Sequence, residues 1–475
     1  MNGAWPKSVL LWTDVAVWLL AAWLLAYVLH VRRLPDLRLQ WRRVFQDRGA
    51  MGAGVVLGAC LVMTLLDSIH YRLALPPVAG QAVSVTAYDV KTRSVLDALL
   101  GRLYASREAT YSRPLASQSF TKESVVLEGR TERRAPRLLH GGAHLRDPST
   151  EAWADIMWRA VLGAGTGLLA SVAILALLCA GAAWRQGRRI RAVVARAWAG
   201  QGGLPWKVAA VTLTALAVLS GLCASLSTGY HVLGTDQTGN DVLYQALKSV
   251  RTAFVIGTLT TLTTLPLAVG LGIAAGYHRG WVDEAVKYLY TVLSSVPNVL
   301  LIAACVLMVQ VFLDQHSELF ETGAERADLK LFLLCAVLGL TGWAGLCRLM
   351  RAETLKQREL DYVRAAQAFG VSHHRIMWRH IFPNVAHLML IVTVLEFSAL
   401  ILYEAVLSYV GVGVDPSMNS FGGMINLARS EMSRDPLVWW SFAAAFGFMV
   451  TIVLAANLLA DGVQKAFDPR LHPGA

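Results

Sequence analysis

The residue types that perform catalysis in enzymes occur in this chain without the spacing that catalysis needs. Gly234 and Gly239 have the spacing of a phosphate-binding loop, but Asn240 and Asp241 stand where such a loop carries lysine and a hydroxyl residue. The six cysteines form no Cys-x-x-Cys pair, and no nucleophile elbow or Ser-His-Asp string occurs. We therefore expect no catalytic centre, no metal site and no cofactor bound by this chain.

Two carboxylates, Glu396 and Glu404, lie within an apolar stretch, where an ionised side chain usually faces a bundle interior or a water-filled path. Their separation places them about 80° apart around a helix, so both are candidates for the border of one translocation pathway. A cationic peptide amino terminus would be a natural partner for either. The alternative is a hydrogen-bonded carboxyl at a helix contact, and both interpretations stay open.

The elements that carry these residues are expected to be membrane-spanning helices. Of the 475 residues, 55% are hydrophobic and only 16% are charged, whereas a soluble domain has about 25% charged residues. The apolar residues come in runs of about twenty, the length that spans a bilayer. The predicted fold is therefore all-α, a polytopic membrane protein with about nine transmembrane helices. The predicted spans are 10–29, 51–67, 160–183, 208–226, 253–276, 288–313, 331–350, 388–413 and 437–460.

The charges of the loops predict the orientation, because Lys and Arg accumulate on the cytoplasmic side. Segments 30–50, 184–207 and 351–386 are basic and are expected to be cytoplasmic, whereas 314–329 is acidic, 414–436 is near neutral, and both are expected outside. Nine spans then place the amino terminus outside and the carboxyl terminus in the cytoplasm. The net charge of +11 fits basic cytoplasmic loops and gives no indication of nucleic-acid binding.

The first 203 residues hold three of the predicted spans and a long hydrophilic segment, 68–155, which is expected outside the membrane. That segment is either a small extracytoplasmic domain or a solvated, partly ordered loop, because a chain this short and polar builds only a marginal core. The other six spans lie in 204–475. We therefore divide the chain into an N-terminal extension, 1–203, and a second domain, 204–475.

The segment between the seventh and eighth predicted spans has the pattern of two short helices. In the first, Tyr362, Ala365, Ala366 and Phe369 recur at helical spacing and form one stripe. Gly370 follows, where the end of a helix commonly needs a left-handed residue.

The second short helix is expected to begin after Ser372, which can cap it. Ile376 and Ile381 share one of its sides, and Pro383 is expected to stop it. Spacing alone favours an amphipathic loop on the membrane surface.

The same segment, 361–383, resembles the "EAA" motif of ABC importer permeases, in which an acidic residue and two alanines precede a glycine and, after a fixed interval, Ile-x-Pro. Arg364 replaces the usual acidic residue, a departure that concerns local salt bridges rather than docking. In that family this loop fits a groove on the ATPase subunit. The residues that match in register are Ala365, Ala366, Gly370, Ile381 and Pro383. The ATPase-coupling residues that the resemblance implies are Asp361, Tyr362, Arg364, Ala365, Ala366, Phe369, Gly370, Ile376, Ile381 and Pro383.

Further strings resemble the C-type permeases of oligopeptide and dipeptide importers. The string 231–243 is similar to their "LGTDxxGRDxxSR", 404–413 to "EAxLSFLGLG", and 466–470 to the closing "DPR". The coupling loop lies closest to Yej-type peptide and microcin importers, and the resemblance covers about 204–475. The outer-face motif consists of Gly234, Thr235, Asp236, Gly239 and Asp241.

Asp241 of this motif is also suited to cap a short helix that would lie flat on the outer surface. Such a helix would brace the translocation mouth or a docked binding protein.

The resemblance implies a permease subunit of an ATP-driven importer in the bacterial inner membrane that translocates peptides or peptide-like solutes by alternating access. The implied partners are a second homologous permease, two ATPase subunits that hold ATP and Mg, and a periplasmic solute-binding protein. Three alternatives stay open: a nickel or metal-chelate importer of the same architecture, a secondary transporter, and a membrane-anchored sensor or assembly factor, which would suit residues 1–203.

Overall fold

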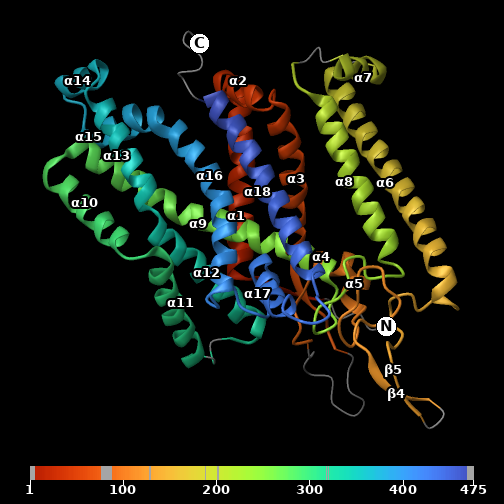
Figure 1. Cartoon of the computed structure of the whole chain (residues 1–475). Coiled ribbons are helices and arrows are strands. Elements are labelled where there is room, and N and C mark those ends of the chain that lie inside the picture. The colour runs from red at the N-terminus through yellow and green to blue at the C-terminus, as the bar shows by residue number, and fades with distance from the viewer. Residues whose placement is uncertain are drawn as a thin grey trace, which may run out of the picture.

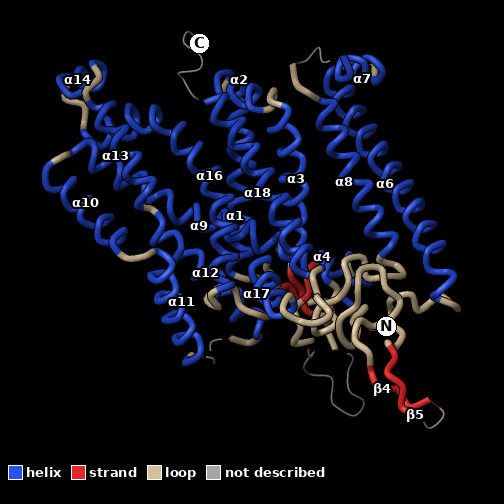
Figure 2. The backbone as a smooth tube through the Cα atoms, viewed as in Figure 1, coloured by secondary structure: helices blue, strands red, loops and turns tan. Residues whose placement is uncertain are grey.

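The computed structural model is mostly helical, with short strands and loops gathered at one end (Figure 2). The predicted closing string 466–470 extends past the last described residue. The described residues are 6–75, 88–127, 130–187, 189–199, 203–316, 318 and 320–467.

Eight helices of the described chain are long and apolar enough to cross a membrane. A ninth crossing is the bent pair α12 (Gly323–Gly342) and α13 (Ala344–Arg358), whose axes differ by 41°. Seven of the nine predicted apolar runs fall on single helices of this kind, and 331–350 falls on the bent pair, which confirms the predicted fold class. The eight helices are α1 (Trp12–Arg33), α3 (Arg48–Asp67), α6 (Pro148–Gln186), α8 (Trp206–Leu226), α9 (Val242–His278), α11 (Asn298–Gln315), α16 (Phe382–Tyr409) and α18 (Trp440–Phe467).

The predicted span 288–313 is not one helix. It covers the end of α10 (Gly280–Ser295) and most of α11, with a break at Val296 and Pro297. Val296 has φ −92° and ψ 134°, an extended conformation. The break has a local cause, because the ring of a proline disfavours the helical conformation of the residue before it.

The two ends of the bundle are formed by different elements. Helices α2 (Pro35–Val44), α7 (Ile190–Ala199) and α14 (Asp361–Ala368) lie at one end, together with the end of α18 (Figure 1). At the other end lie the short strands and α17 (Phe421–Glu431). The segments predicted to be cytoplasmic thus share one end, and those predicted to be outside share the other. We call these ends the coupling end and the outer end.

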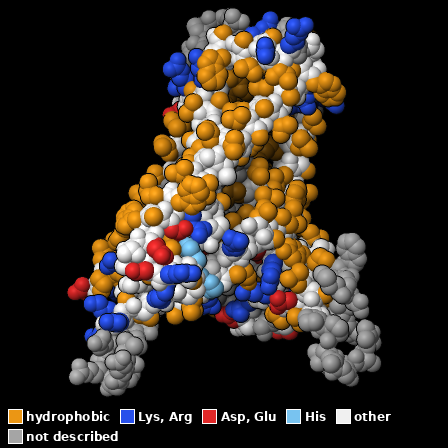
Figure 3. Space-filling model, turned by 90° about the vertical axis from the view of Figure 1, so that its right-hand side faces the viewer, with side chains coloured by type: hydrophobic (Ala, Val, Ile, Leu, Met, Phe, Trp, Pro, Cys, Tyr) orange, Lys and Arg blue, Asp and Glu red, His pale blue; other side chains and the backbone are white. Residues whose placement is uncertain are grey.

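The N-terminal extension is interleaved with the rest of the bundle. Helix α3 packs along α18 and α9, whereas α8 packs mainly on α6 and secondarily on α3. Gly167 and Gly221 bring the backbones of α6 and α8 together: a Cβ at Gly167 would lie 2.4 Å from the carbonyl oxygen of Ala217. The predicted boundary between 203 and 204 therefore divides a helix hairpin. The face that carries this hairpin is covered by hydrophobic side chains over its middle, as expected for contact with lipid (Figure 3).

The outer segment, predicted as 68–155, is folded onto the helices over its described residues. Strands β1 (Lys7–Val9), β2 (His70–Arg72) and β3 (Arg93–Ser94) form one antiparallel sheet, and β4 (Glu123–Leu127) pairs with β5 (Arg130–Arg134). Short helices α4 (Val95–Leu99) and α5 (Gly101–Ala105) follow β3.

Tyr111, the largest fully buried side chain among the described residues, comes from this segment. It is 1% exposed and packs in the same core cluster as Phe421 and Trp440 of the helical bundle. The segment therefore shares the hydrophobic core of the bundle. It does not depend on a core of its own, which a short polar chain could build only marginally.

Candidate functional site

The predicted coupling loop forms a compact turn at the coupling end. Gly370 joins α14 to α15 (His373–Ile376) with φ +75°, as predicted for a left-handed position. The prediction that Pro383 stops the second helix is wrong. A π-helical turn, η2 (Met377–Ile381), leads directly into α16, and Pro383 lies in the first turn of that helix, where its missing N–H costs little.

One side of the loop is anchored in the bundle. Val363, Ile376 and Ile381 are fully buried and Ala366 is 9% exposed, all in one cluster with Met350 of α13. Burial of these apolar side chains fixes the loop against the ends of α9, α13 and α16. The loop is therefore packed directly on membrane-spanning helices.

The other side of the loop faces outward. Phe369 is 87% exposed, Trp378 50% and Tyr362 40%. Most of the predicted stripe of α14 therefore points away from the bundle, and only Ala366 of it lies on the buried side with Val363. Exposed aromatic side chains around a small-residue face are typical of a surface that receives a partner.

The position where Arg364 replaces an acidic residue keeps an ion pair. Arg364 donates to Glu359 at 2.5 Å, and Arg279, which follows α9, donates to the same carboxylate at 2.6 Å. The pKa of Glu359 is lowered, mainly by the hydrogen bond from Arg364 and further by the charge of Arg279. Slight desolvation opposes this shift but is outweighed. Tyr277 of α9 also bonds His373 Nδ1 through its hydroxyl at 2.8 Å. The loop is thus tied to the end of α9 by polar contacts as well as by burial.

The outer-face motif is a tight turn that precedes α9. Gly234 and Gly239 have φ +74° and +76°, and a Cβ at Gly239 would lie 1.8 Å from the carbonyl oxygen of Glu108. Asp236 accepts from the backbone N–H groups of Thr238 and Asn240 at 2.8 and 2.9 Å. The two glycines are therefore required both by the backbone conformation and by the close approach of the outer segment.

Asp241 caps α9 as predicted, accepting from the backbone N–H of Tyr244 at 3.1 Å. The predicted short helix lying flat on the surface is wrong, because the helix continues for 37 residues to His278. Its first turns are buried beneath the outer segment and around α17, so no apolar face is left for the interface.

The motif binds a segment of its own chain. Thr235 accepts from the backbone N–H of Ser112 at 2.7 Å and donates to the carbonyl of Thr110 at 2.9 Å. Glu108 accepts from the backbone N–H groups of residues 139–141 at 2.7 to 3.0 Å. These contacts join the outer segment to the start of α9.

His231 links the two parts through a buried ion bridge. Its Nδ1 lies 2.7 Å from Asp241 and its Nε2 lies 3.3 Å from Glu108, and the side chain is 2% exposed. Burial by itself would lower the pKa of His231, but the hydrogen bonds to Asp241 and Glu108 outweigh it and raise the pKa to about 9. Burial likewise opposes ionisation of Glu108, yet the bonds from His231 and from three backbone N–H groups lower its pKa to about 2. An ionised bridge therefore holds the outer segment at neutral pH.

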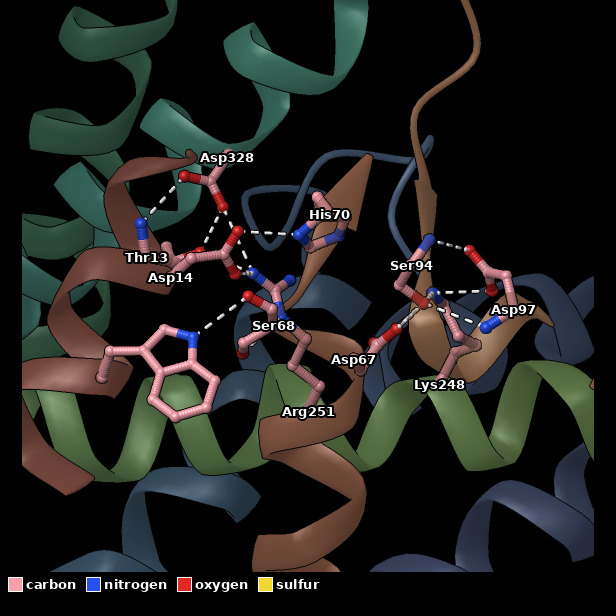
Figure 4. Close-up of polar contacts among 11 residues, drawn as sticks. Thr13, Asp14, Asp67, Ser68, His70, Ser94, Asp97, Lys248, Arg251 and Asp328 are labelled. Atoms are coloured by element: carbon pink, nitrogen blue, oxygen red, sulfur yellow. Dashed lines mark hydrogen bonds and ion pairs between the residues drawn. The ribbon is translucent and has the colours of Figure 1, made fainter. Parts of the chain in front are cut away.

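A second set of buried charges lies beside the motif, where α1, α3, α9 and α12 meet at the outer end (Figure 4). Arg251 of α9 donates to Asp14 of α1 at 2.6 Å and lies 3.6 Å from Asp328 of α12. Thr13 donates its backbone N–H to Asp328 at 2.9 Å, and His70 Nδ1 lies 2.7 Å from Asp14.

One turn earlier on α9, Lys248 lies 2.5 Å from Asp67 at the end of α3 and 2.9 Å from Asp97 of α4. Ser94 donates to Asp67 at 2.6 Å, so it joins the same cluster. These contacts were not predicted from the sequence. The features that could have indicated them are an acidic residue, Asp14, in the first apolar run, and two cations, Lys248 and Arg251, one helical turn apart near the start of a span.

The two carboxylates predicted within a span have different surroundings. Glu404 is 4% exposed and accepts from Ser408 at 2.7 Å and from the backbone N–H of Gly422 at 3.1 Å. It therefore lies in the contact of α16 with α17, the alternative left open by the sequence. Glu396 is exposed on α16 of the isolated chain, and its place in a translocation pathway stays a prediction.

A bundle of membrane-spanning helices with a loop anchored at one end is the architecture expected of a transport permease. A family model described as "Binding-protein-dependent transport system inner membrane component" matches residues 268–473. An oligopeptide transport system permease protein, OppC, of Mycobacterium tuberculosis H37Rv is 31% identical over 239 residues, which cover 50% of this chain and 76% of that protein. The chain belongs to this family and is an ABC importer permease of the oligopeptide and dipeptide type.

Other relatives have the same extent of similarity. A glutathione transport system permease protein, GsiD, of Pectobacterium atrosepticum is 30% identical over 51% of this chain and 73% of its own length. The OppC protein of Escherichia coli K12 is 27% identical over 50% of this chain and 72% of its own length. About half of the chain is therefore covered by each of these relatives.

Proposed function

We propose that this chain translocates peptides or peptide-like solutes across the bacterial inner membrane as one permease subunit of an ATP-driven importer. The printed names of its relatives refer to oligopeptide and glutathione systems, which favours a peptide over nickel or a metal chelate. The observation that carries the proposal is the loop 361–383, with buried apolar residues on one side and exposed aromatic residues on the other.

In this proposal the loop acts as a lever. The exposed side, around Phe369 and Ala365, enters a groove of an ATPase subunit, while Val363, Ile376 and Ile381 transmit its displacement to the membrane-spanning helices. ATP binding must favour one conformation of the bundle over the other, since a ligand shifts an equilibrium only by its differential affinity. Opening then alternates between the two sides of the membrane.

The assembly implied by this mechanism contains a second homologous permease, two ATPase subunits that bind ATP and Mg, and an extracytoplasmic solute-binding protein. The coupling end, with basic segments 30–50 and 184–207, faces the cytoplasm together with the carboxyl terminus. The amino terminus is outside. Glu396 on α16 is proposed to border the pathway between the two permeases.

The proposal is tested with Phe369→Ala in the complete importer, reconstituted in proteoliposomes with ATP inside. Removal of an 87% exposed ring leaves the bundle intact but removes a contact with the ATPase, so we expect ATP-dependent peptide uptake to fall about tenfold or more. The matched control is Leu39→Ala, since Leu39 is 53% exposed on α2 at the same end, and its uptake should be unchanged. Equal uptake by the two variants would contradict a coupling role, and uptake without ATP would favour a secondary transporter.

A further inference from the structure

A polar cavity of about 690 Å³ lies at the outer end, between the N-terminal extension and the bundle. Residues of the outer segment, such as Asp89 and Tyr104, form one wall, and the beginnings of α9 and α12 form the other. The volume falls within the range of about 300–1,000 Å³ that is typical of small-ligand sites. The extension therefore creates, together with the bundle, a space large enough for a short peptide.

The buried wall of this cavity carries more acidic than basic groups. Four carboxylates, Asp14, Asp67, Asp97 and Asp328, are each at most 8% exposed, and they share only two cations. Lys248 lies between Asp67 and Asp97, and Arg251 lies between Asp14 and Asp328 (Figure 4). Of these four, Asp67, Asp97 and Asp328 line the cavity itself, and two further carboxylates, Asp89 and Asp241, line it as well.

His70, the remaining titratable neighbour of this network, contacts Asp14 at 2.7 Å. Even with His70 included, four carboxyl groups face only three basic groups. An uncompensated buried charge is unfavourable, so the wall favours a further cation in the cavity. Asp67 offers an acceptor for it: Oδ1 accepts from Lys248 and Ser94, whereas Oδ2 has no hydrogen-bond partner among the described residues.

The rim of the cavity carries a net positive charge, since two cations, Lys91 and Arg107, stand there with one carboxylate, Asp89. Lys91 and Arg107 are exposed residues of the outer segment that line it. The Nζ of Lys91 lies 4.6 Å from the ring centroid of Tyr104, and Arg107 Nε donates to the carbonyl of Thr238 at 2.9 Å. Within the described part of the chain neither cation is in an ion pair, so both are open to an anionic group.

We propose that this cavity binds a short peptide as a zwitterion. Its protonated amino group lies over the carboxylates of Asp67 and Asp97, and its carboxylate lies beside Lys91 and Arg107. The choice of a peptide as ligand rests on the proposed function, whereas the arrangement of charges does not. The N-terminal extension thereby supplies a solute site at the outer mouth of the permease.

The test measures peptide binding by calorimetry to the membrane complex in nanodiscs, without nucleotide and without the soluble binding protein. The probes are trialanine, N-acetyl-trialanine and trialanine amide. Acetylation removes the cation, and we expect it to weaken binding about ten- to a hundredfold, since hydrogen bonds to charged groups are the strong ones. Amidation of the carboxyl group should weaken binding about three- to tenfold, because the rim is exposed to solvent.

Rim variants test the orientation of the peptide without disturbing the buried network. Lys91→Ala with Arg107→Ala should weaken binding of trialanine and leave binding of trialanine amide unchanged. The matched control is Lys122→Ala, an exposed lysine of the outer segment that does not line the cavity, and its affinity should equal that of the parent.

The proposal is overturned if trialanine and its acetylated form bind equally, or if no trialanine binding is detected at about 10 mM, where millimolar affinity would be visible. It is also overturned if the rim variants behave as Lys122→Ala does. Uptake by Phe369→Ala tests the proposed function separately, because the binding measurement needs neither ATP nor an ATPase contact.

Discussion

The coupling end and the outer end use charged and aromatic side chains in opposite ways. At the coupling end, Phe369 and Trp378 point outward and the ion pairs of Glu359 are exposed. At the outer end, Arg251 and His231 are at most 5% exposed and bind carboxylates of other segments. The comparison shows that one end leaves these side chains exposed, as the proposed contact with an ATPase subunit requires, whereas the other end binds a segment of its own chain.

The sharpest test of this contrast is Arg251→Met. The substitution leaves Asp14 and Asp328 buried without their cation, so we expect the free energy of unfolding to fall by about 3–5 kcal/mol. Thermal denaturation of the detergent-solubilised chain measures the effect. Arg326→Met is the matched control, because Arg326 pairs with Asp314 on the exposed surface of the same end, and its Tm should stay within error. Equal losses would show that the outer network is no more structural than a surface pair.

A smaller effect is expected for Gly239→Ala, which tests the close approach of the outer segment. The new Cβ would collide with the carbonyl of Glu108 in addition to straining a positive φ, for a loss of about 2–4 kcal/mol. Gly187→Ala is the control, since its φ is +61° and nothing lies within 4 Å, so it should lose only about 1 kcal/mol. Hydrogen exchange of residues 106–112 should rise in the first variant and not in the second.

The next smaller effect is expected at alkaline pH, which should weaken the ion bridge of His231. The pKa of His231 is raised from about 6.5 to about 9, so its stabilisation is complete below about pH 6.5 and is lost as the pH rises through 9. Limited proteolysis of the outer segment should therefore be faster at pH 10 than at pH 7. In His231→Gln the segment should be cleaved readily at both pH values, and an unchanged pH dependence in that variant would exclude the bridge as its cause.

The smallest effect on stability is expected for Arg364→Ala at the coupling end. Glu359 keeps Arg279 as a partner, and all three side chains are exposed, so the Tm of the isolated chain should not change measurably. A large drop in Tm would contradict the view that this end depends on burial of Ile376 and Ile381 rather than on its ion pairs. Any loss of uptake at constant Tm would place Arg364 in the partner contact.

Much of the molecule was predictable because its causes are local. Seven of the nine apolar runs fall on single helices, Gly370 is left-handed, and Asp241 caps α9, since hydrophobic length, φ preference and capping depend on adjacent residues. The incorrect predictions also concerned local features of the chain. Pro383 was expected to end a helix, but a preceding π turn places it in the first turn of α16, and Pro297 was overlooked as the break between α10 and α11.

The buried networks were not predictable in the same way. Asp14, Arg251 and Asp328 are separated by 237 and 77 positions in the chain. In a hydropathy plot each of them is only a charged residue near the end of a span. Their pairing depends on α1, α9 and α12 meeting at the outer end. The site residues predicted at the coupling end were found by resemblance, and their exposure could be read only from the packing of the loop.

By itself, the sequence determined which segments cross the membrane, which segments share a side, and where the turns before α9 and after α14 lie. Those properties follow from the transfer of short stretches of chain into lipid and from the conformational limits of single residues. Only the tertiary structure decided that the outer segment is bound to the bundle and that the cavity has an acidic floor and a basic rim. Burial of a charge is tolerable only beside its counter-charge, and which counter-charge is near depends on how distant helices pack.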